Sequence, residues 1–156
     1  MHDCQCGCPQ DCCVDEAGDL MQKLVRTLQM FERATLTRHG FTFSQCYTML
    51  NIYQNKVMTM NQLSSEMNLD ISTMTRVVTR LKRDNYLHRE RSAEDRRVVL
   101  IRLTPKGEQA AAELSREVKD FYSNIICQIP QGEVERVFAS VQLLLGAFEK
   151  VRPFCC

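Results

Sequence analysis

The sequence has no apolar run near the length of about 20 residues that a membrane-spanning helix needs. Its N-terminus carries acids and cysteines and lacks the basic and then apolar segments of a secretion signal. We therefore expect a cytoplasmic protein with no membrane partner. Apolar residues make up 44% of the chain and charged residues 25%, which is typical of a globular protein.

Sequence motifs of enzymes are also missing. The chain has no glycine-rich phosphate loop, no His-Glu-x-x-His zinc motif and no nucleophile with a recognisable base partner. It also has no Cys-x-x-Cys pair of the kind found in zinc fingers. The sequence therefore indicates a binding protein and not an enzyme.

The segment 70–81 predicts a helix with two different faces. Asp70 is a suitable N-cap, and Asn85 can end the helix in the left-handed conformation. Four apolar residues recur at the spacing of one helical stripe and should face a core: Met74, Val77, Val78 and Leu81. The other face carries hydroxyl and guanidinium groups, which suit phosphates and base edges in a DNA major groove. These groups belong to Ser72, Arg76, Thr79, Arg80 and Arg83.

The surrounding segments predict a winged helix-turn-helix. Residues 60–67 form a shorter predicted helix, with Thr59 and Gln62 at the spacing of a capping box. Two strand-like segments, 86–91 and 97–103, follow the longer helix. The polar tip between these strands carries arginines and could reach along the DNA backbone or into a minor groove.

Positive charge is concentrated in the same part of the chain. From Arg76 to Arg102 there are nine Lys and Arg residues against four Asp and Glu residues, whereas the whole chain has a formal net charge of only +1. A local excess of this kind favours a nucleic-acid partner. The sequence therefore predicts binding to double-stranded DNA.

In the order and spacing of these motifs, the chain resembles the MarR (multiple-antibiotic-resistance regulator) family of winged-helix repressors. The resemblance covers about 17–150 and is strongest over 70–87 and 95–107. The latter segment holds the wing tip Asp95-Arg96-Arg97 and the sequence Leu-Thr-Pro-Lys-Gly, which opens a long helix. The pair Asn85-Tyr86 departs from the family, in which glycine usually precedes an apolar residue.

The resemblance implies roles for particular residues. Asp95 would brace the wing while Arg97 enters the minor groove, with Arg96 beside it at the tip. The residues expected over the major groove are Ser72, Thr73, Arg76 and Thr79.

The fold class expected is mainly α, with about six helices, a two-stranded β wing and a dimer formed through the first and last helices. The first helix is predicted over 17–37, and Ser44 is predicted to cap a second helix that ends near Gln54. Thr104 should cap a long helix that ends near Cys127, and a last helix should cover about 132–150. The predicted organisation has cysteine-bearing tails at 1–16 and 151–156 around a winged-helix domain at 17–150. Within that domain the DNA-binding lobe is about 42–104, and the dimerisation helices are about 17–38 and 105–150.

The apolar stripe of the last predicted helix is too wide for its own small domain to bury, which favours a partner chain. Paired half-sites in DNA also call for a two-fold dimer, whose recognition helices lie about 34–36 Å apart. The sequence therefore predicts a homodimeric repressor that occupies a pseudo-palindromic operator.

Seven of the nine cysteines lie in the tails. They are Cys4, Cys6, Cys8, Cys12, Cys13, Cys155 and Cys156. In a reducing compartment such thiols more often bind metal or sense redox state than form structural disulfides. The alternating cysteines of the N-terminal tail could hold one soft ion such as zinc, copper(I), cadmium, mercury or arsenic(III), with His2 as a further ligand. Cys46 and Cys127 are predicted to be small core residues.

The signal that controls DNA binding has several candidates. Our preferred hypothesis is a soft metal or metalloid ion that ties the cysteine-bearing ends together and releases DNA. The ion can shift the equilibrium between the DNA-binding and the released conformation only by its difference in affinity for the two. The alternatives are oxidation of the same cysteines and a small phenolic ligand in a pocket between the lobes. A hypothesis of another class is a metal-buffering protein with no operator.

Overall fold

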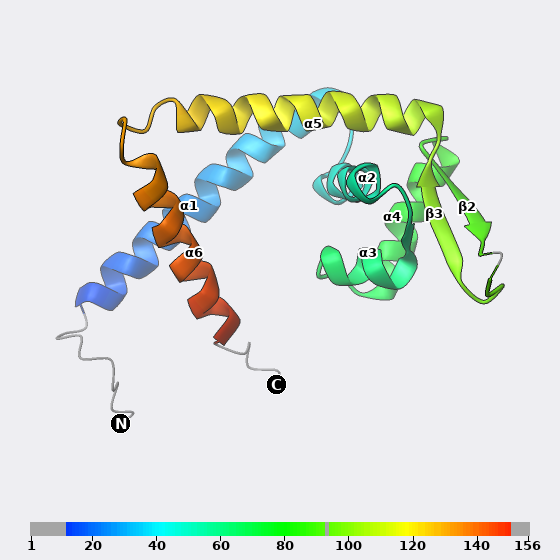
Figure 1. Ribbon diagram of the computed structural model, residues 1–156, viewed down its shortest axis with the longest axis horizontal. Coiled ribbons are helices and arrows are strands. Elements are labelled where there is room, and N and C mark those ends of the chain that lie inside the picture. The colour runs from blue at the N-terminus through cyan, green and yellow to red at the C-terminus, as the bar shows by residue number, and fades with distance from the viewer. Residues whose placement is uncertain (1–11, 93, 151–156) are drawn as a thin grey trace. The chain divides into compact units, whose positions relative to one another are not determined.

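The computed structural model describes residues 12–92 and 94–150, apart from the side chains of residues 12–13 and 31–37. Figure 1 shows the elements of these ranges. In chain order they are α1 (Cys12–Leu36), η1 (Thr37–His39), α2 (Phe43–Asn55), β1 (Met58–Thr59), α3 (Met60–Glu66), α4 (Ile71–Arg83), β2 (Leu87–Arg91), β3 (Val99–Leu103), α5 (Pro105–Ile126) and α6 (Val134–Lys150). The chain divides into two compact units, one ending at Leu114 and the other beginning at Ser115.

The first unit contains a winged helix-turn-helix. Its antiparallel sheet has the order β1-β3-β2, with Met58 opposite Ile101 and Leu87 opposite Leu103. The helices α2, α3 and α4 and the sheet share one apolar core. Its fully buried side chains include Cys46, Met49, Ile52, Leu63, Met74, Val78, Leu81 and Ile101. The prediction of a mainly α winged-helix fold is therefore confirmed.

Each helix of the helix-turn-helix begins at a side-chain cap. Thr59 and Gln62 form the predicted capping box at α3, with the Gln62 amide N–H donating to Thr59 Oγ1 at 3.2 Å. Asp70 caps α4, as predicted, by accepting the Thr73 amide N–H at 2.9 Å. These caps satisfy amides that have no partner inside the helix, and they fix where each helix starts.

Two boundaries and the number of strands differ from the predictions. The cap of α2 is Thr42, in a capping box with Gln45, and not Ser44. The helix α1 begins at Cys12, inside the segment 1–16 that is predicted to be the N-terminal tail. The prediction misses this start because it depends on the apolar residues that follow. The sheet has a third strand, the two-residue β1, which is too short to produce an alternating sequence pattern.

Along α2, three polar side chains point toward methionine sulfurs of other segments. Thr48 donates to Met74 Sδ at 3.9 Å, and Asn51 donates to Met67 Sδ at 3.3 Å. Asn55 similarly donates to the sulfur of Met58, at 3.8 Å. Thioether sulfur is a weak acceptor, and here it serves the buried Thr48, the half-buried Asn51 and the exposed Asn55.

A compact turn joins α4 to the wing. Asn85 has a φ of 61°, and its amide donates to the Lys82 carbonyl at 3.0 Å. The Tyr86 amide donates to the Leu81 carbonyl at 2.8 Å, which completes a Schellman motif with asparagine in the left-handed position. The chain therefore makes the predicted left-handed turn with Asn85 at the position where the family usually has glycine.

The start of α5 is bonded to this same turn. Thr104 caps α5 by accepting the Gly107 amide N–H at 3.0 Å, and its hydroxyl donates to the Asn85 carbonyl at 2.7 Å. Lys106 donates to the Asp84 carbonyl at 2.9 Å, and its ammonium lies 4.1 Å from the centre of the Tyr86 ring. The Leu-Thr-Pro-Lys-Gly sequence thus attaches α5 to the end of α4.

The helices α1 and α6 expose apolar side chains within this chain. On α1 these are Val14, Leu20, Leu24, Val25 and Met30. On α6 they are Val137, Phe138, Val141, Leu143, Leu145 and Phe148. No residue of α6 is buried. The prediction that the last helix cannot bury its stripe in its own domain is therefore confirmed. Within residues 12–92 and 94–150, no helix combines the length and apolarity that crossing a bilayer demands.

Candidate DNA-binding surface

The helix α4 separates its apolar and polar residues as its sequence predicts. Met74, Val78 and Leu81 are fully buried in the core, whereas Val77, also predicted to face the core, is half-buried. The opposite side presents polar and basic residues at the surface: Ser72, Arg76, Thr79, Arg80 and Arg83. Thr73, which only the family resemblance indicated, is half-buried at the first turn. The packing of one side thus leaves a basic face free for a partner.

At the start of α4, the Asp70 carboxylate binds two hydroxyl groups. Ser72 donates to one carboxylate oxygen, and Thr73 Oγ1 donates to the other at 2.6 Å. These bonds, and the bond from the Thr73 amide, hold the pKa of Asp70 well below its usual range. Because both hydroxyl hydrogens point to Asp70, the oxygens of Ser72 and Thr73 face outward mainly as acceptors.

The arginines of α4 differ in their partners. Arg83 donates to Asp84 at 2.9 Å, and this hydrogen bond lowers the pKa of Asp84. Arg76 and Arg80 are exposed and have no carboxylate at ion-pair distance among the described residues. A guanidinium group without an ion pair has all its donors available for phosphates or guanine edges.

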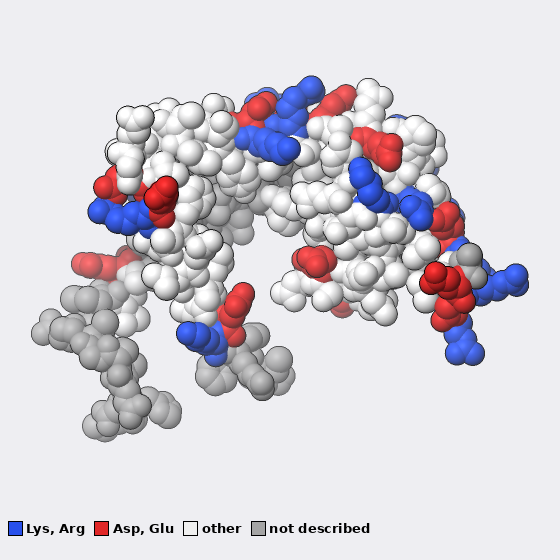
Figure 2. All heavy atoms as spheres, viewed as in Figure 1, with Lys and Arg blue, Asp and Glu red and all other residues white. Residues whose placement is uncertain are grey.

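The tip of the wing is held by Asp95. Its carboxylate accepts the Arg97 amide N–H at 2.8 Å, and its carbonyl accepts the Val98 amide at 2.9 Å. Arg96 and Arg97 are exposed. Figure 2 shows basic side chains extending from the end of the first unit where β2 and β3 meet in Figure 1. The hydrogen bonds that Asp95 accepts give the tip a defined backbone shape, from which both arginines reach solvent.

Arg89 of β2 is a residue of this surface that the sequence reasoning did not single out. Its Nη2 donates to Thr79 Oγ1 at 3.1 Å, and the side chain is half-buried. The contact joins the wing to the polar face of α4. Strand alternation can place Arg89 on one side of the sheet, but it cannot indicate which residue of α4 lies there.

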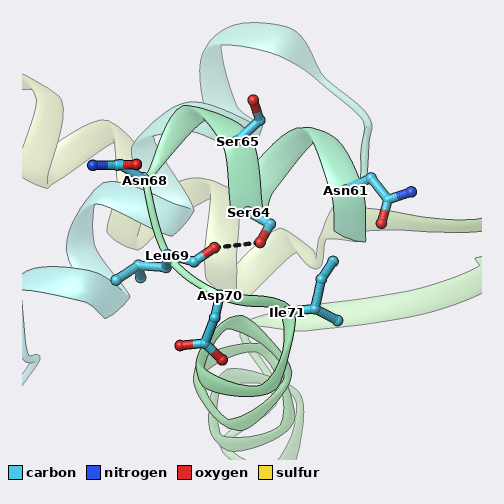
Figure 3. Close-up of a pocket in the computed structure, with 7 residues that line it drawn as sticks. All are labelled: Asn61, Ser64, Ser65, Asn68, Leu69, Asp70 and Ile71. Carbon is cyan, nitrogen blue, oxygen red and sulfur yellow. Dashed lines mark hydrogen bonds between the residues drawn. The ribbon is translucent and has the colours of Figure 1, made fainter. Parts of the chain in front are cut away.

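A polar depression lies where α3 turns into α4. Figure 3 shows its lining residues, which come from α3, the turn and the start of α4. They are Asn61, Ser64, Ser65, Asn68, Leu69, Asp70 and Ile71. Ser64 donates to the Leu69 carbonyl and closes the turn from within, while Asn68 adopts a φ of 48°. The depression is therefore part of the helix-turn-helix itself.

The cysteines of the described residues do not form a metal site. Cys46 is fully buried, and burial raises the pKa of its thiol to about 12, which confirms the prediction of a core residue. Cys127 is exposed just after α5, so the prediction that it belongs to the core is wrong. The described residues contain no group of three or more possible metal ligands.

The tail cysteines lie largely outside the structure. Cys4, Cys6, Cys8, Cys155 and Cys156 are outside the described residues. Cys12 and Cys13 are described only in their backbone, at the first turn of α1. The predicted site in the tails therefore stays a prediction.

Comparison with known proteins identifies the winged-helix region. The model of the MarR family matches residues 41–99. The uncharacterized HTH-type transcriptional regulator YsmB of Bacillus subtilis is 28% identical over 102 residues, which are 65% of this chain and 70% of that protein. The organic hydroperoxide resistance transcriptional regulator of the same species is 31% identical over 72 residues, or 46% of this chain. The match spans about half the length of that relative, at 49%.

A solved structure extends the likeness to most of the chain. Streptococcus pneumoniae FabT, in a crystal structure with DNA, has a TM-score of 0.81 and 22% sequence identity to this chain. The match covers 89% of this chain and 99% of that one, and at this identity it establishes the fold alone. The family match covers α2, α3, α4, β2 and the tip of the wing, and it ends before the start of α5. Residues 41–99 therefore carry the winged-helix region of a MarR-family transcriptional regulator.

Proposed function

We propose that this regulator is a homodimeric repressor that binds a pseudo-palindromic DNA operator through α4 and the wing. The observation that carries this proposal is the exposed basic face of α4. Arg76 and Arg80 lie there without carboxylate partners among the described residues, so binding to DNA would break no ion pair of theirs. A groove of B-DNA offers such side chains phosphates and guanine edges.

A second copy of the chain is the partner that the operator requires. The apolar side chains exposed on α1 and α6 would destabilise a soluble monomer and are typical of an interaction surface. A two-fold dimer places two recognition helices in successive major grooves, about 34–36 Å apart. Any change in that separation affects both half-sites at once, so a ligand in the dimerisation region can control DNA binding.

The ligand that we propose is a soft metal or metalloid ion held by the tail cysteines. Seven thiols lie within the first 13 and the last two residues of the sequence, and thiolates prefer ions such as zinc, copper(I) and arsenic(III). Cys46 is unsuited to this role because it is buried and stays protonated. In this mechanism the bound ion favours a dimer whose helices no longer match the operator.

Oxidation of the same cysteines is a second candidate signal. It is favoured by the name of one relative, the organic hydroperoxide resistance regulator of Bacillus subtilis, whose match covers 46% of this chain. Peroxide oxidises accessible thiolates to sulfenic acid and then to disulfides. The two candidates need the same residues but respond to different agents.

One binding experiment separates these possibilities. Duplex DNA is first enriched from a random pool by the reduced wild-type protein, and its binding is then measured by fluorescence anisotropy. Zinc, copper(I), arsenite and peroxide are titrated separately against the wild type and a variant with all seven tail cysteines changed to serine. The variant keeps Cys46 and Cys127 and so controls for thiols outside the tails.

Each outcome has a distinct meaning. Release of the wild type but not of the variant by one agent supports sensing by the tails and identifies the signal. If every agent affects the DNA binding of both proteins equally, sensing by the tails is contradicted. A small-molecule ligand then becomes the candidate signal. Failure of the wild type to enrich any duplex contradicts the DNA-binding proposal, and uptake of several ions per chain would then favour a metal buffer.

A further inference from the structure

In the described part of the chain, one side-chain hydrogen bond links the wing to the polar face of the recognition helix. Arg89 of β2 donates from Nη2 to Thr79 Oγ1 of α4 at 3.1 Å. The neighbouring strand residues His88, Glu90 and Arg91 are exposed, whereas Arg89 is half-buried. Its guanidinium group is therefore held between the sheet and α4.

The stability of the folded protein does not explain this placement. Arg89 Nε is buried and has no hydrogen-bond partner among the described residues, and a buried unsatisfied donor destabilises the folded state. No carboxylate among the described residues lies at ion-pair distance from Arg89. A buried polar group that is left unsatisfied in a native protein calls for an explanation, and a role of its side chain in binding is one.

The bond has a direct effect on what Thr79 can offer to DNA. A hydroxyl group has one hydrogen to donate and two lone pairs with which to accept. Arg89 occupies one lone pair and cannot accept, so the hydroxyl hydrogen of Thr79 is free to point to another acceptor. Donation by a cation also strengthens the hydroxyl as a donor, because hydrogen bonds in a chain polarise one another.

We propose that Arg89 is a positioning residue that makes Thr79 a hydrogen-bond donor to a base edge and thereby sets one position of the operator sequence. The acceptors that fit are N7 of a purine, O6 of guanine and O4 of thymine in the major groove. The start of α4 is arranged in the opposite sense, since the hydroxyl hydrogens of Ser72 and Thr73 point to Asp70. The helix thus offers acceptors at its first turn and a donor two turns later. This inference rests on the proposed function.

The test uses the full-length protein and the duplex enriched by the wild type. Affinities of Thr79→Val, Arg89→Gln and the double variant are measured by anisotropy for that duplex and for every single-base-pair change of it. Each single variant should bind about three- to tenfold more weakly, and both should lose preference at the same base pair. The double variant should bind no more weakly than the weaker of the two single variants, because both changes remove the same contact.

The matched control is Arg91→Gln, which removes the same charge from the same strand at an exposed residue that makes no hydrogen bond to α4 within the described residues. It should keep the base preference of the wild type and weaken binding to all duplexes alike. Arg89→Met, which retains the apolar stem, serves as a second variant, and circular dichroism checks the fold of each protein.

Three results would overturn the inference: independent, additive losses in the double variant, equal weakening by Arg89→Gln on every duplex, or loss of preference at different base pairs. Equal weakening would indicate that Arg89 contacts a phosphate directly. If the wild type enriches no duplex at all, the DNA-binding proposal fails instead, and this outcome is visible before any variant is measured.

Discussion

Replacing Gly107 by alanine should destabilise the junction between α4 and α5. A Cβ atom added at Gly107 would lie 2.0 Å from the Tyr86 carbonyl oxygen and 3.2 Å from Leu103 Cδ2. Real Cβ contacts are essentially never shorter than 3.0 Å, so one of the two backbones must move by about 1 Å. The same oxygen accepts the Thr104 amide N–H at 3.0 Å, and that bond would be strained or lost.

The expected fall in the free energy of unfolding follows from three contributions. Overpacking of a close contact costs about 1–3 kcal/mol, and a lost hydrogen bond costs about 1 kcal/mol. Alanine gains about 1 kcal/mol over glycine in helix propensity. We therefore expect the free energy of unfolding to fall by about 2 kcal/mol, which for a chain of this size lowers the urea midpoint by about 1 M.

The assay is urea unfolding followed by circular dichroism, at one fixed protein concentration because a dimer unfolds in a concentration-dependent way. Gly18→Ala in α1 is the matched control, since a Cβ atom there meets no atom within 4 Å. It should leave the midpoint unchanged or raise it through helix propensity. A Gly107→Ala protein as stable as the wild type would refute the reasoning that this contact requires glycine.

Four further predictions concern single side chains. Arg76→Ala should weaken operator binding by about 1–3 kcal/mol and relax preference at one base pair, so unchanged affinity and preference would remove it from the interface. Arg97→Ala should reduce the dependence of affinity on salt, and an identical salt slope would argue against the wing contact. The low pKa of Asp70, caused first by the Ser72 hydrogen bond, stabilises the folded state above the ordinary carboxyl pKa of about 4. The stability advantage of the wild type over Asp70→Asn should therefore shrink in urea titrations as pH falls below about 4, and a constant difference would contradict this. Cys46, with a pKa of about 12, should resist alkylation by iodoacetamide in the folded protein and react in urea, as mass spectrometry can show.

Features that depend on local sequence were predictable. The box of Thr59 and Gln62, the cap at Asp70 and the left-handed Asn85 each follow from residues within one turn of each other, and the structure confirms them. The two faces of α4 follow from its periodicity in the same way. Family membership, once recognised from the wing and the start of α5, also supports the expectation of a regulator and not an enzyme.

Features that depend on contacts between distant segments were not predictable. The strand β1 has two residues and exists because β3 supplies its hydrogen-bond partners. Cys127 shares the sequence pattern of a core residue but follows the last turn of α5, where no described residue covers it. The contact of Arg89 with Thr79 joins residues ten positions apart through the geometry of a strand and a helix. No periodicity encodes such a pairing.

The methionine sulfurs that accept hydrogen bonds from side chains of α2 constrain how this sequence can change over evolution. If Met67 became leucine, the core volume would be nearly kept, but the Asn51 amide would lose its acceptor. If Asn51 changed first to an apolar residue, the later loss of the sulfur would cost little. The same holds for Thr48 with Met74. Substitutions at these pairs are therefore epistatic, and related sequences should exchange both members together and in a preferred order.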